Sequence, residues 1–179
     1  VAMALFILVH FFLLLTGMAA FLLSVFSIFN HSKAFHEFYH RMSMQHSYYP
    51  KVSVLAPVRG FDGKFEENIM SLLRQDYPKG RWEVLFIVDN DDSKTEIEVK
   101  KIVKNVRAKN ARIVHSVPLL TCSGKNAAMI AGVKHAEYDV IAGYDSDARV
   151  GGKWLASLVG PLEDKSVGVT TGYRFYLPS

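Results

Sequence analysis

The sequence Asp139-Val140-Ile141-Ala142-Gly143-Tyr144-Asp145-Ser146-Asp147 joins an apolar run to a pair of carboxylates. The apolar part, 139–144, predicts a buried strand. Two carboxylates that follow such a strand, two residues apart, can both reach one divalent cation, and that cation could neutralise a diphosphate. We therefore expect Asp145 and Asp147 to bind Mg²⁺ or Mn²⁺. Asp147 is the expected direct ligand, and Asp145 binds either the metal or a hydroxyl group of the substrate.

Short apolar runs alternate with amphipathic stretches through the chain after Pro50. Such alternation predicts an α/β fold with a doubly wound, mostly parallel sheet. The predicted strands are 52–56, 83–88, 111–115, 139–144 and 167–172, and the predicted helices are 62–75, 93–109, 125–136 and 153–162. In sheets of this kind ligands bind at the carboxyl ends of the strands.

Three predicted strand ends have unusual chemistry: the turn Pro57-Val58-Arg59-Gly60, the acidic run 89–92, and the Asp145/Asp147 pair. They share one edge if the first, second and fourth strands are neighbours. Carboxylates of the acidic run can accept hydrogen bonds from a base N–H or a ribose hydroxyl. The alternative is that such residues cap the following helix, and we expect this role for Asp92 and Ser93.

Lys125 stands at the predicted start of a helix, directly after a glycine. A lysine and free backbone N–H groups at a helix N-terminus favour an anionic group. The alternative is an ordinary solvent-facing lysine. Arg149 is predicted to pair either with phosphate or with Asp145.

The first 29 residues contain no Asp, Glu, Lys or Arg. This is long enough for a membrane-spanning helix, whereas a signal peptide would have a basic start and a shorter apolar run. We expect a transmembrane anchor at 1–29, a juxtamembrane linker at 30–50 and a domain at 51–179. Lys33 and Arg41 after the anchor predict a single-pass topology with the domain on the cytoplasmic side.

Basic and acidic side chains nearly balance in residues 51–179, which argues against nucleic-acid binding. Cys122 is the single cysteine, so the chain has no disulfide framework.

These motifs together resemble family-2 glycosyltransferases of the GT-A fold, a Rossmann-like nucleotide-diphospho-sugar transferase fold, and most closely the ceramide glucosyltransferase group. The resemblance covers about residues 51–178, with a matching membrane anchor before them. Its motifs are the first strand with its turn at 52–62, Asp76-Tyr77-Pro78, Trp82-Glu83-Val84-Leu85, the spacing from Lys125 to Asp139, and Asp145-Ser146-Asp147-Ala148-Arg149-Val150.

The resemblance implies transfer of a hexose, commonly glucose, from a UDP-sugar to a lipid acceptor such as ceramide. It also implies a nucleotide-sugar site and a metal site. The implied nucleotide-sugar ligands are Pro57, Asp89 or Asp91, Lys125 and Asp145, and the implied ligands of Mg²⁺ or Mn²⁺ are Asp145 and Asp147.

The family's acceptor-side general base and its Gln/Arg-x-x-Arg-Trp motif come later than the region matched here, so we expect the base beyond Ser179. The chain is therefore interpreted as the N-terminal, donor-binding half of a glycosyltransferase, with a separate C-terminal half as a possible partner. Two alternatives remain open: a non-catalytic nucleotide-sugar-binding subunit, and a glycosyltransferase of the polysaccharide-synthase type. A nucleotidyltransferase is disfavoured, because Pro57-Val58-Arg59-Gly60 is too short for its Gly-rich loop.

Overall fold

The computed structural model describes residues 2–43 and 47–175, and the chain divides into two compact units, 1–45 and 46–179. The first unit is one helix, α1 (Ala2–Ser43), which at 1.5 Å per residue is about 63 Å long. Its stretch Met3–His36 is long and apolar enough to cross a membrane. Large apolar side chains such as Phe11, Phe12 and Leu14 are exposed on it, as expected of a helix that needs an apolar environment. The helix continues through much of the predicted linker, and the functional division at residue 29 stays a prediction.

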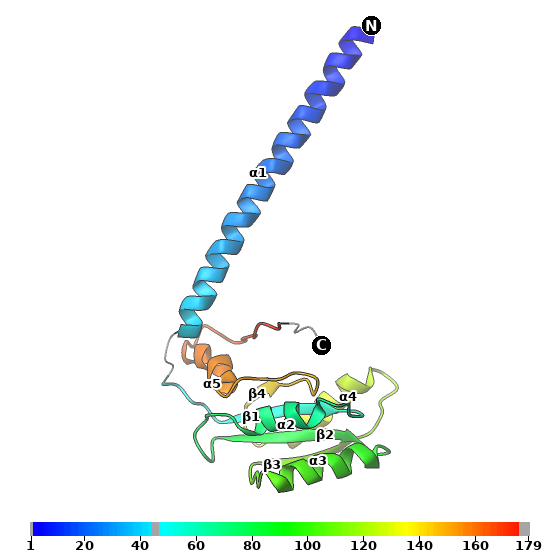
Figure 1. Ribbon diagram of the computed structural model, residues 1–179, viewed down its shortest axis with the longest axis vertical. Coiled ribbons are helices and arrows are strands. Elements are labelled where there is room, and N and C mark those ends of the chain that lie inside the picture. Colours follow the sequence, from blue (N-terminus) through cyan, green and yellow to red (C-terminus); the bar gives the residue numbers. More distant parts are fainter. Residues whose placement is uncertain (1, 44–46, 176–179) are drawn as a thin grey trace. The chain divides into compact units, whose positions relative to one another are not determined.

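The second unit is a four-stranded sheet with helices packed against it (Figure 1). Its elements are β1 (Val52–Val58), α2 (Phe65–Leu73), β2 (Trp82–Asp89), α3 (Ser93–Asn105), β3 (Ala111–Ser116), α4 (Gly124–His135), β4 (Val140–Gly143), α5 (Trp154–Val159) and the 3-10 helix η1 (Gly160–Glu163).

The strand order is β3-β2-β1-β4, and every pair is parallel. The predicted α/β fold with a parallel, doubly wound sheet is therefore confirmed, and the first strand does lie between the second and the fourth. The chain builds outward from β1 to β3, and then returns through α4 to place β4 on the other side of β1. The strand order thus reverses between β1 and β4, which is where ligands bind in open sheets of this type.

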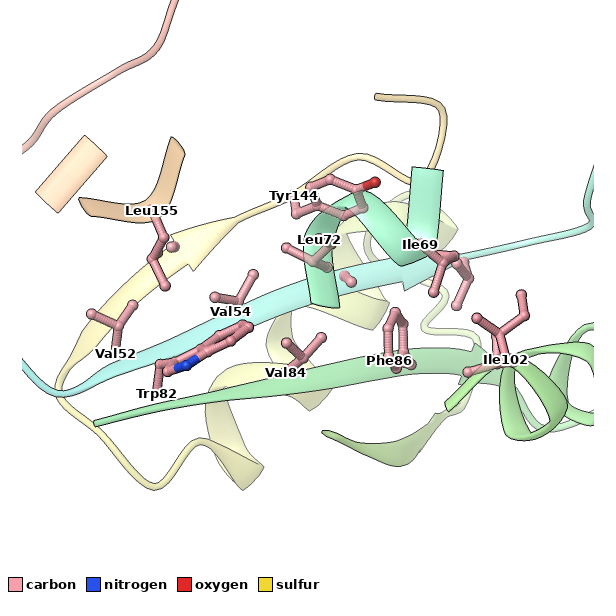
Figure 2. Close-up of a cluster of buried hydrophobic side chains, with 14 of the residues drawn as sticks. Val52, Val54, Ile69, Leu72, Trp82, Val84, Phe86, Ile102, Tyr144 and Leu155 are labelled. Carbon is pink, nitrogen blue, oxygen red and sulfur yellow. The ribbon is translucent and has the colours of Figure 1, made fainter. Parts of the chain in front are cut away.

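The side chains of β1 and β2 alternate between two cores. Even-numbered residues such as Val54, Val84 and Phe86 pack with α2, α3 and α5. Figure 2 shows Ile69 and Leu72 of α2 in this cluster. Because β1 and β2 are central strands with helices on both faces, both read as nearly continuous apolar runs.

The opposite face, with Leu55, Leu85 and Ile87, is covered by α4. Gly132 permits a close approach here, because a Cβ at this position would lie 2.9 Å from Ile87 Cδ1 and 3.1 Å from Leu55 Cδ2. The helix therefore lies closer to the sheet than a larger residue would allow.

Helix boundaries differ from the predicted ones for local reasons. The second helix begins at Phe65 because Asp62 forms a turn instead, accepting Lys64 N–H through Oδ1 at 2.9 Å. The third helix ends at Asn105, since Arg107 adopts a left-handed φ of 53°. The helix predicted to start at Lys153 is α5, followed by the separate 3-10 turn η1 that contains Pro161.

The predicted fifth strand, 167–172, was wrong: residues 167–175 have no regular secondary structure. The β-branched residues there match strand composition, but a strand exists only through pairing with a neighbour. Within the described ranges, β4 pairs only with β1. The segment is instead fastened by a side chain, since Thr170 Oγ1 donates to Leu158 O at 2.6 Å.

Candidate functional site

Pro57 marks the point at which β4 separates from β1. Val52 N–H bonds toward the β2 side and Leu55 C=O toward the β4 side, where it accepts Tyr144 N–H at 2.9 Å. By this alternation Pro57 faces the β4 side, and β4 has already ended at Gly143. A residue without an N–H therefore loses no ladder bond here, and the chain is free to turn away from β1 and present Asp145 and Asp147.

Asp145 follows that divergence and is the most strongly paired carboxylate at this edge. Its Oδ1 accepts a hydrogen bond from Lys125 Nζ at 2.5 Å, and its Oδ2 contacts the guanidinium of Arg174. The ammonium of Lys125 first, and then the guanidinium of Arg174, hold the pKa of Asp145 below its usual range. The carboxylate is therefore ionised throughout the neutral range.

The backbone of the turn from Asp145 to Ala148 is held by hydrogen bonds from buried polar groups. Ala148 N–H donates to Asp145 O at 2.9 Å, and the hydroxyl of buried Tyr144 lies 2.6 Å from Ala148 O. Asn68 of α2 donates through Nδ2 to Ser146 O at 3.2 Å. Burial raises the pKa of the Tyr144 phenol, which keeps it a neutral donor. These contacts fix the backbone and leave the side chain of Asp147 exposed at the surface.

Asp89 lies at the end of β2, the next strand end along this edge. Ser116 Oγ, at the end of β3, donates to Asp89 Oδ1 at 2.7 Å, and Arg59 Nε lies 3.8 Å from Oδ2. Asp91, by contrast, is exposed. The structure thus holds Asp89 at the sheet edge and leaves Asp91 in the solvent-facing turn.

Asp92 is the N-cap of α3, as predicted, and accepts Thr95 N–H at 3.2 Å. Its other oxygen accepts Gly60 N–H at 3.1 Å, which ties the turn after β1 to α3. Ser93 is the first residue of the helix, so the cap predicted for it belongs to Asp92 alone.

Lys125 lies in the first turn of α4, whose N-cap is Ser123. Its ammonium is exposed but ion-paired with Asp145, so it is not an ordinary solvent-facing lysine. Arg59 also reaches this helix, because a Cβ at Gly124 would lie 3.9 Å from its Nη1. The ends of β1 and β2, the start of α4 and the turn after β4 therefore converge.

The structure brings Asp145 and Lys125 together and places Asp89 beside Arg59. Arg149 does not pair with Asp145 and instead lies 3.1 Å from Glu67 Oε2. Sequence analysis did not select Arg59 or Arg174 as site residues. Arg59 could have been found, since it stands within the turn that follows the first strand, but nothing local distinguishes Arg174.

The turn after β4 offers a metal ion two carboxylates, those of Asp145 and Asp147. In the part of the chain that the structure describes, no three or more His, Cys, Asp or Glu side chains are grouped to hold a metal. Mg²⁺ usually takes one or two carboxylates and completes its shell with water and substrate phosphate. Asp145 and Asp147 therefore fit a metal shared with a phosphate-bearing substrate, and they do not form a closed protein cage.

Comparisons with known proteins point to one family. The sequence profile described as Glycosyl transferase family 21 matches residues 15–178. The Bacillus subtilis (strain 168) protein described as probable glycosyltransferase YdaM is 27% identical over 124 residues, which are 69% of this chain and 29% of that protein. The chain thus spans less than a third of this relative.

A solved structure with the same fold is that of the mannosyltransferase PcManGT from Pyrobaculum calidifontis, in complex with GDP-Man and Mn²⁺. The similarity has a TM-score of 0.60 and 22% identity, and covers 75% of this chain and 40% of that one. The likeness supports the GT-A fold inferred from the sequence motifs.

Proposed function

The chain belongs to glycosyl transferase family 21, and from this premise we propose that it forms the donor site of a membrane-anchored glycosyltransferase. The reaction proposed is transfer of a hexose, glucose first among them, from a UDP-sugar to a lipid acceptor such as ceramide. The observation that carries the proposal is the position of Asp145 and Asp147. They follow the strand at which the sheet order reverses, beside Lys125 at the start of a helix.

The nucleotide would lie along the edge formed by the ends of β1 and β2. Asp89 is the proposed ligand of the base or ribose, because it is held at the strand end by Ser116, and exposed Asp91 is the alternative. Pro57 would border the nucleotide where β1 parts from β4. Lys125 and the N-terminus of α4 favour the diphosphate, since both present positive charge to it.

Asp145 and Asp147 are the proposed ligands of Mg²⁺ or Mn²⁺, with Asp147 the direct one. When bound, such an ion acts as a Lewis acid that stabilises the charge on a departing diphosphate. The structure of the mannosyltransferase of similar fold contains Mn²⁺ together with GDP-Man, which supports a divalent cation as the cofactor. The chain's own contribution is to hold the Asp145–Ala148 turn through Tyr144 and Asn68, so that both carboxylates start in place.

Transfer with inversion needs a base that removes the proton of the acceptor hydroxyl. We propose that this base is a further carboxylate beyond Ser179, as the family resemblance implies. The lipid acceptor is consistent with α1, whose stretch Met3–His36 is long and apolar enough for a single-pass anchor. Lys33 and Arg41 after the apolar run favour the cytoplasmic side for the domain.

The test is calorimetric titration of the detergent-solubilised chain with UDP and UDP-glucose, with and without Mn²⁺. GDP-mannose serves as the comparison donor. Metal-dependent binding of UDP-glucose in preference to GDP-mannose is expected. A folded chain that binds neither nucleotide in the presence of metal would contradict the proposal.

A second candidate is a subunit that binds a nucleotide-sugar at the same donor site without transferring it. Donor binding is then identical, and hydrolysis or transfer separates the two functions. If a longer form of the protein transfers labelled sugar from UDP-[14C]glucose to a membrane lipid fraction, the glycosyltransferase function is supported. Binding without release under the same conditions supports the subunit. Incorporation into a polymer rather than a lipid would identify the polysaccharide-synthase type.

A further inference from the structure

Arg174 contacts one of the two carboxylates proposed to hold the metal, although it comes from a segment without regular secondary structure. We infer that Arg174 is a ligand of the donor diphosphate and that, with Lys125, it makes the site select nucleoside diphosphates over monophosphates. This inference rests on the proposed donor site and adds to it a residue that determines specificity.

The geometry places two cations on one carboxylate. Lys125 Nζ lies 2.5 Å from Oδ1 of Asp145, and the Arg174 guanidinium contacts Oδ2 of the same group. The two positive groups therefore lie on the two oxygens of one carboxylate. Two cations placed side by side in this way can pair with two adjacent phosphate groups, which are joined through a single bridging oxygen.

A metal ion bound by Asp145 would connect this carboxylate to the diphosphate. Ligands of the same ion are neighbours, so a side chain that touches Asp145 is also within reach of phosphate oxygens on that ion. Arginine is well suited to this position, since its planar guanidinium can donate two parallel hydrogen bonds to phosphate. Because the guanidinium is still half exposed, it can turn from the carboxylate to the ligand.

The alternative is an ordinary surface ion pair, and the chain contains one for comparison. Arg149 pairs with Glu67 at 3.1 Å, and both side chains are well exposed. The partner of Arg174 differs, since Asp145 is half-buried and already bound by Lys125. The segment that contains Arg174 is attached to α5 four residues earlier, where Thr170 Oγ1 donates to Leu158 O.

The experiment compares UDP with UMP on the full detergent-solubilised chain, with Mn²⁺ present, for wild type, Arg174→Gln and Arg174→Lys. Arg149→Gln is the matched control, because it removes an exposed, ion-paired arginine from the same region. GDP with GMP is a second nucleotide pair. Circular dichroism and urea unfolding confirm that each variant is folded.

Arg174→Gln is expected to lower UDP affinity by roughly ten- to hundredfold and to change UMP affinity by less than about threefold. Arg174→Lys is expected to recover part of the lost UDP affinity, because lysine keeps the positive charge but cannot donate two parallel hydrogen bonds to phosphate. Arg149→Gln is expected to match wild type. Equal losses for UDP and UMP, or an equal loss in Arg149→Gln, would overturn the role of Arg174 and leave the donor site standing. Failure of the folded wild type to bind any of the nucleotides would overturn both proposals.

Discussion

Both ends of the parallel sheet contain carboxylates bound by basic side chains, but the two ends are built differently. At the amino ends of the strands, Glu83 accepts Ser53 Oγ–H and Glu137 N–H through Oε1, each at 2.7 Å. Its other oxygen accepts Arg112 Nε–H at 3.1 Å, and the Glu83 side chain is 8% exposed. At the carboxyl ends, the side chain of Asp145 is 27% exposed, and the described residues that bind its carboxylate are two long side chains, Lys125 and Arg174, that are more exposed than itself.

The difference separates a structural carboxylate from one that can exchange partners. A backbone N–H and a buried hydroxyl cannot leave Glu83 without being left unpaired, which is costly in the interior. Lys125 and Arg174 can each turn to solvent or to a ligand at little cost. The Glu83 pair therefore stabilises the amino end of the sheet, which we call the fastened end. The Asp145 pairs at the carboxyl end can give way to a ligand, and we call this the replaceable end.

Glu83→Ala tests the fastened end and has the largest expected effect. It leaves Ser53, Arg112 and the Glu137 N–H without their acceptor, so the free energy of unfolding should fall by about 3 kcal/mol. Urea unfolding followed by tryptophan fluorescence measures this. Glu137→Ala is the control, because its backbone N–H still donates to Glu83. If Glu83→Ala and Glu137→Ala have the same free energy of unfolding, the structural role of Glu83 is contradicted.

Asp147→Ala tests the replaceable end. Loss of the proposed direct metal ligand should reduce Mn²⁺-dependent UDP affinity by about a hundredfold, while the exposed position predicts a stability change below about 0.5 kcal/mol. Calorimetry gives the first quantity and urea unfolding the second. Asp139→Ala, at the opposite end of the β4 segment, is the matched control. If both variants bind UDP as wild type does, the assignment of the metal site is wrong.

Tyr144→Phe affects the support beneath the replaceable end. Removal of the hydroxyl leaves Ala148 O and Asn68 O without this donor, at a cost of about 1 kcal/mol. Because the Asp145–Ala148 turn is then less well held, Mn²⁺-dependent UDP affinity should also fall, by about threefold. Tyr77→Phe is the comparison, since it removes a buried hydroxyl that donates to Pro50 O far from this edge. A loss of affinity in Tyr77→Phe as large as that in Tyr144→Phe would contradict the local explanation.

Acidification should have the smallest effect on stability. The pKa of Asp145 is held below its usual range, so its ionised form stabilises the fold above about pH 4 and this contribution is lost as the pH falls through the lowered pKa. Since its partners Lys125 and Arg174 are both more than half exposed, the contribution should stay below about 0.5 kcal/mol. Unfolding of wild type and Asp145→Asn between pH 3 and pH 7 measures it. A difference between the two proteins that grows on acidification would contradict the sign.

Sequence analysis predicted most of the sheet because its signals are local. Apolar runs of strand length and amphipathic spacing indicated four of the strands and the helices between them. The strand-end rule indicated Asp145, and the position at a helix start indicated Lys125. Long-range partners gave no such signal. The fifth strand failed because 167–172 has strand composition without a strand beside it, and the pairing of Arg174 with Asp145 depends on the path of that segment. Glu83 was predicted to begin a strand, but its three donors come from three distant parts of the sequence.

The separation of β4 from β1 near Pro57 affects which sequence changes the fold can tolerate. Because no ladder bond forms between β1 and the chain after Tyr144, insertions and substitutions in the following turn need not shift the register of any strand. Tyr144 and Asn68 hold this turn through its backbone carbonyls, so the identity of its side chains is not constrained by those bonds. Side chains in the turn 145–148 can therefore be replaced without loss of the bonds that hold its backbone, so a change in the chemistry of this turn need not disturb the fold of the sheet.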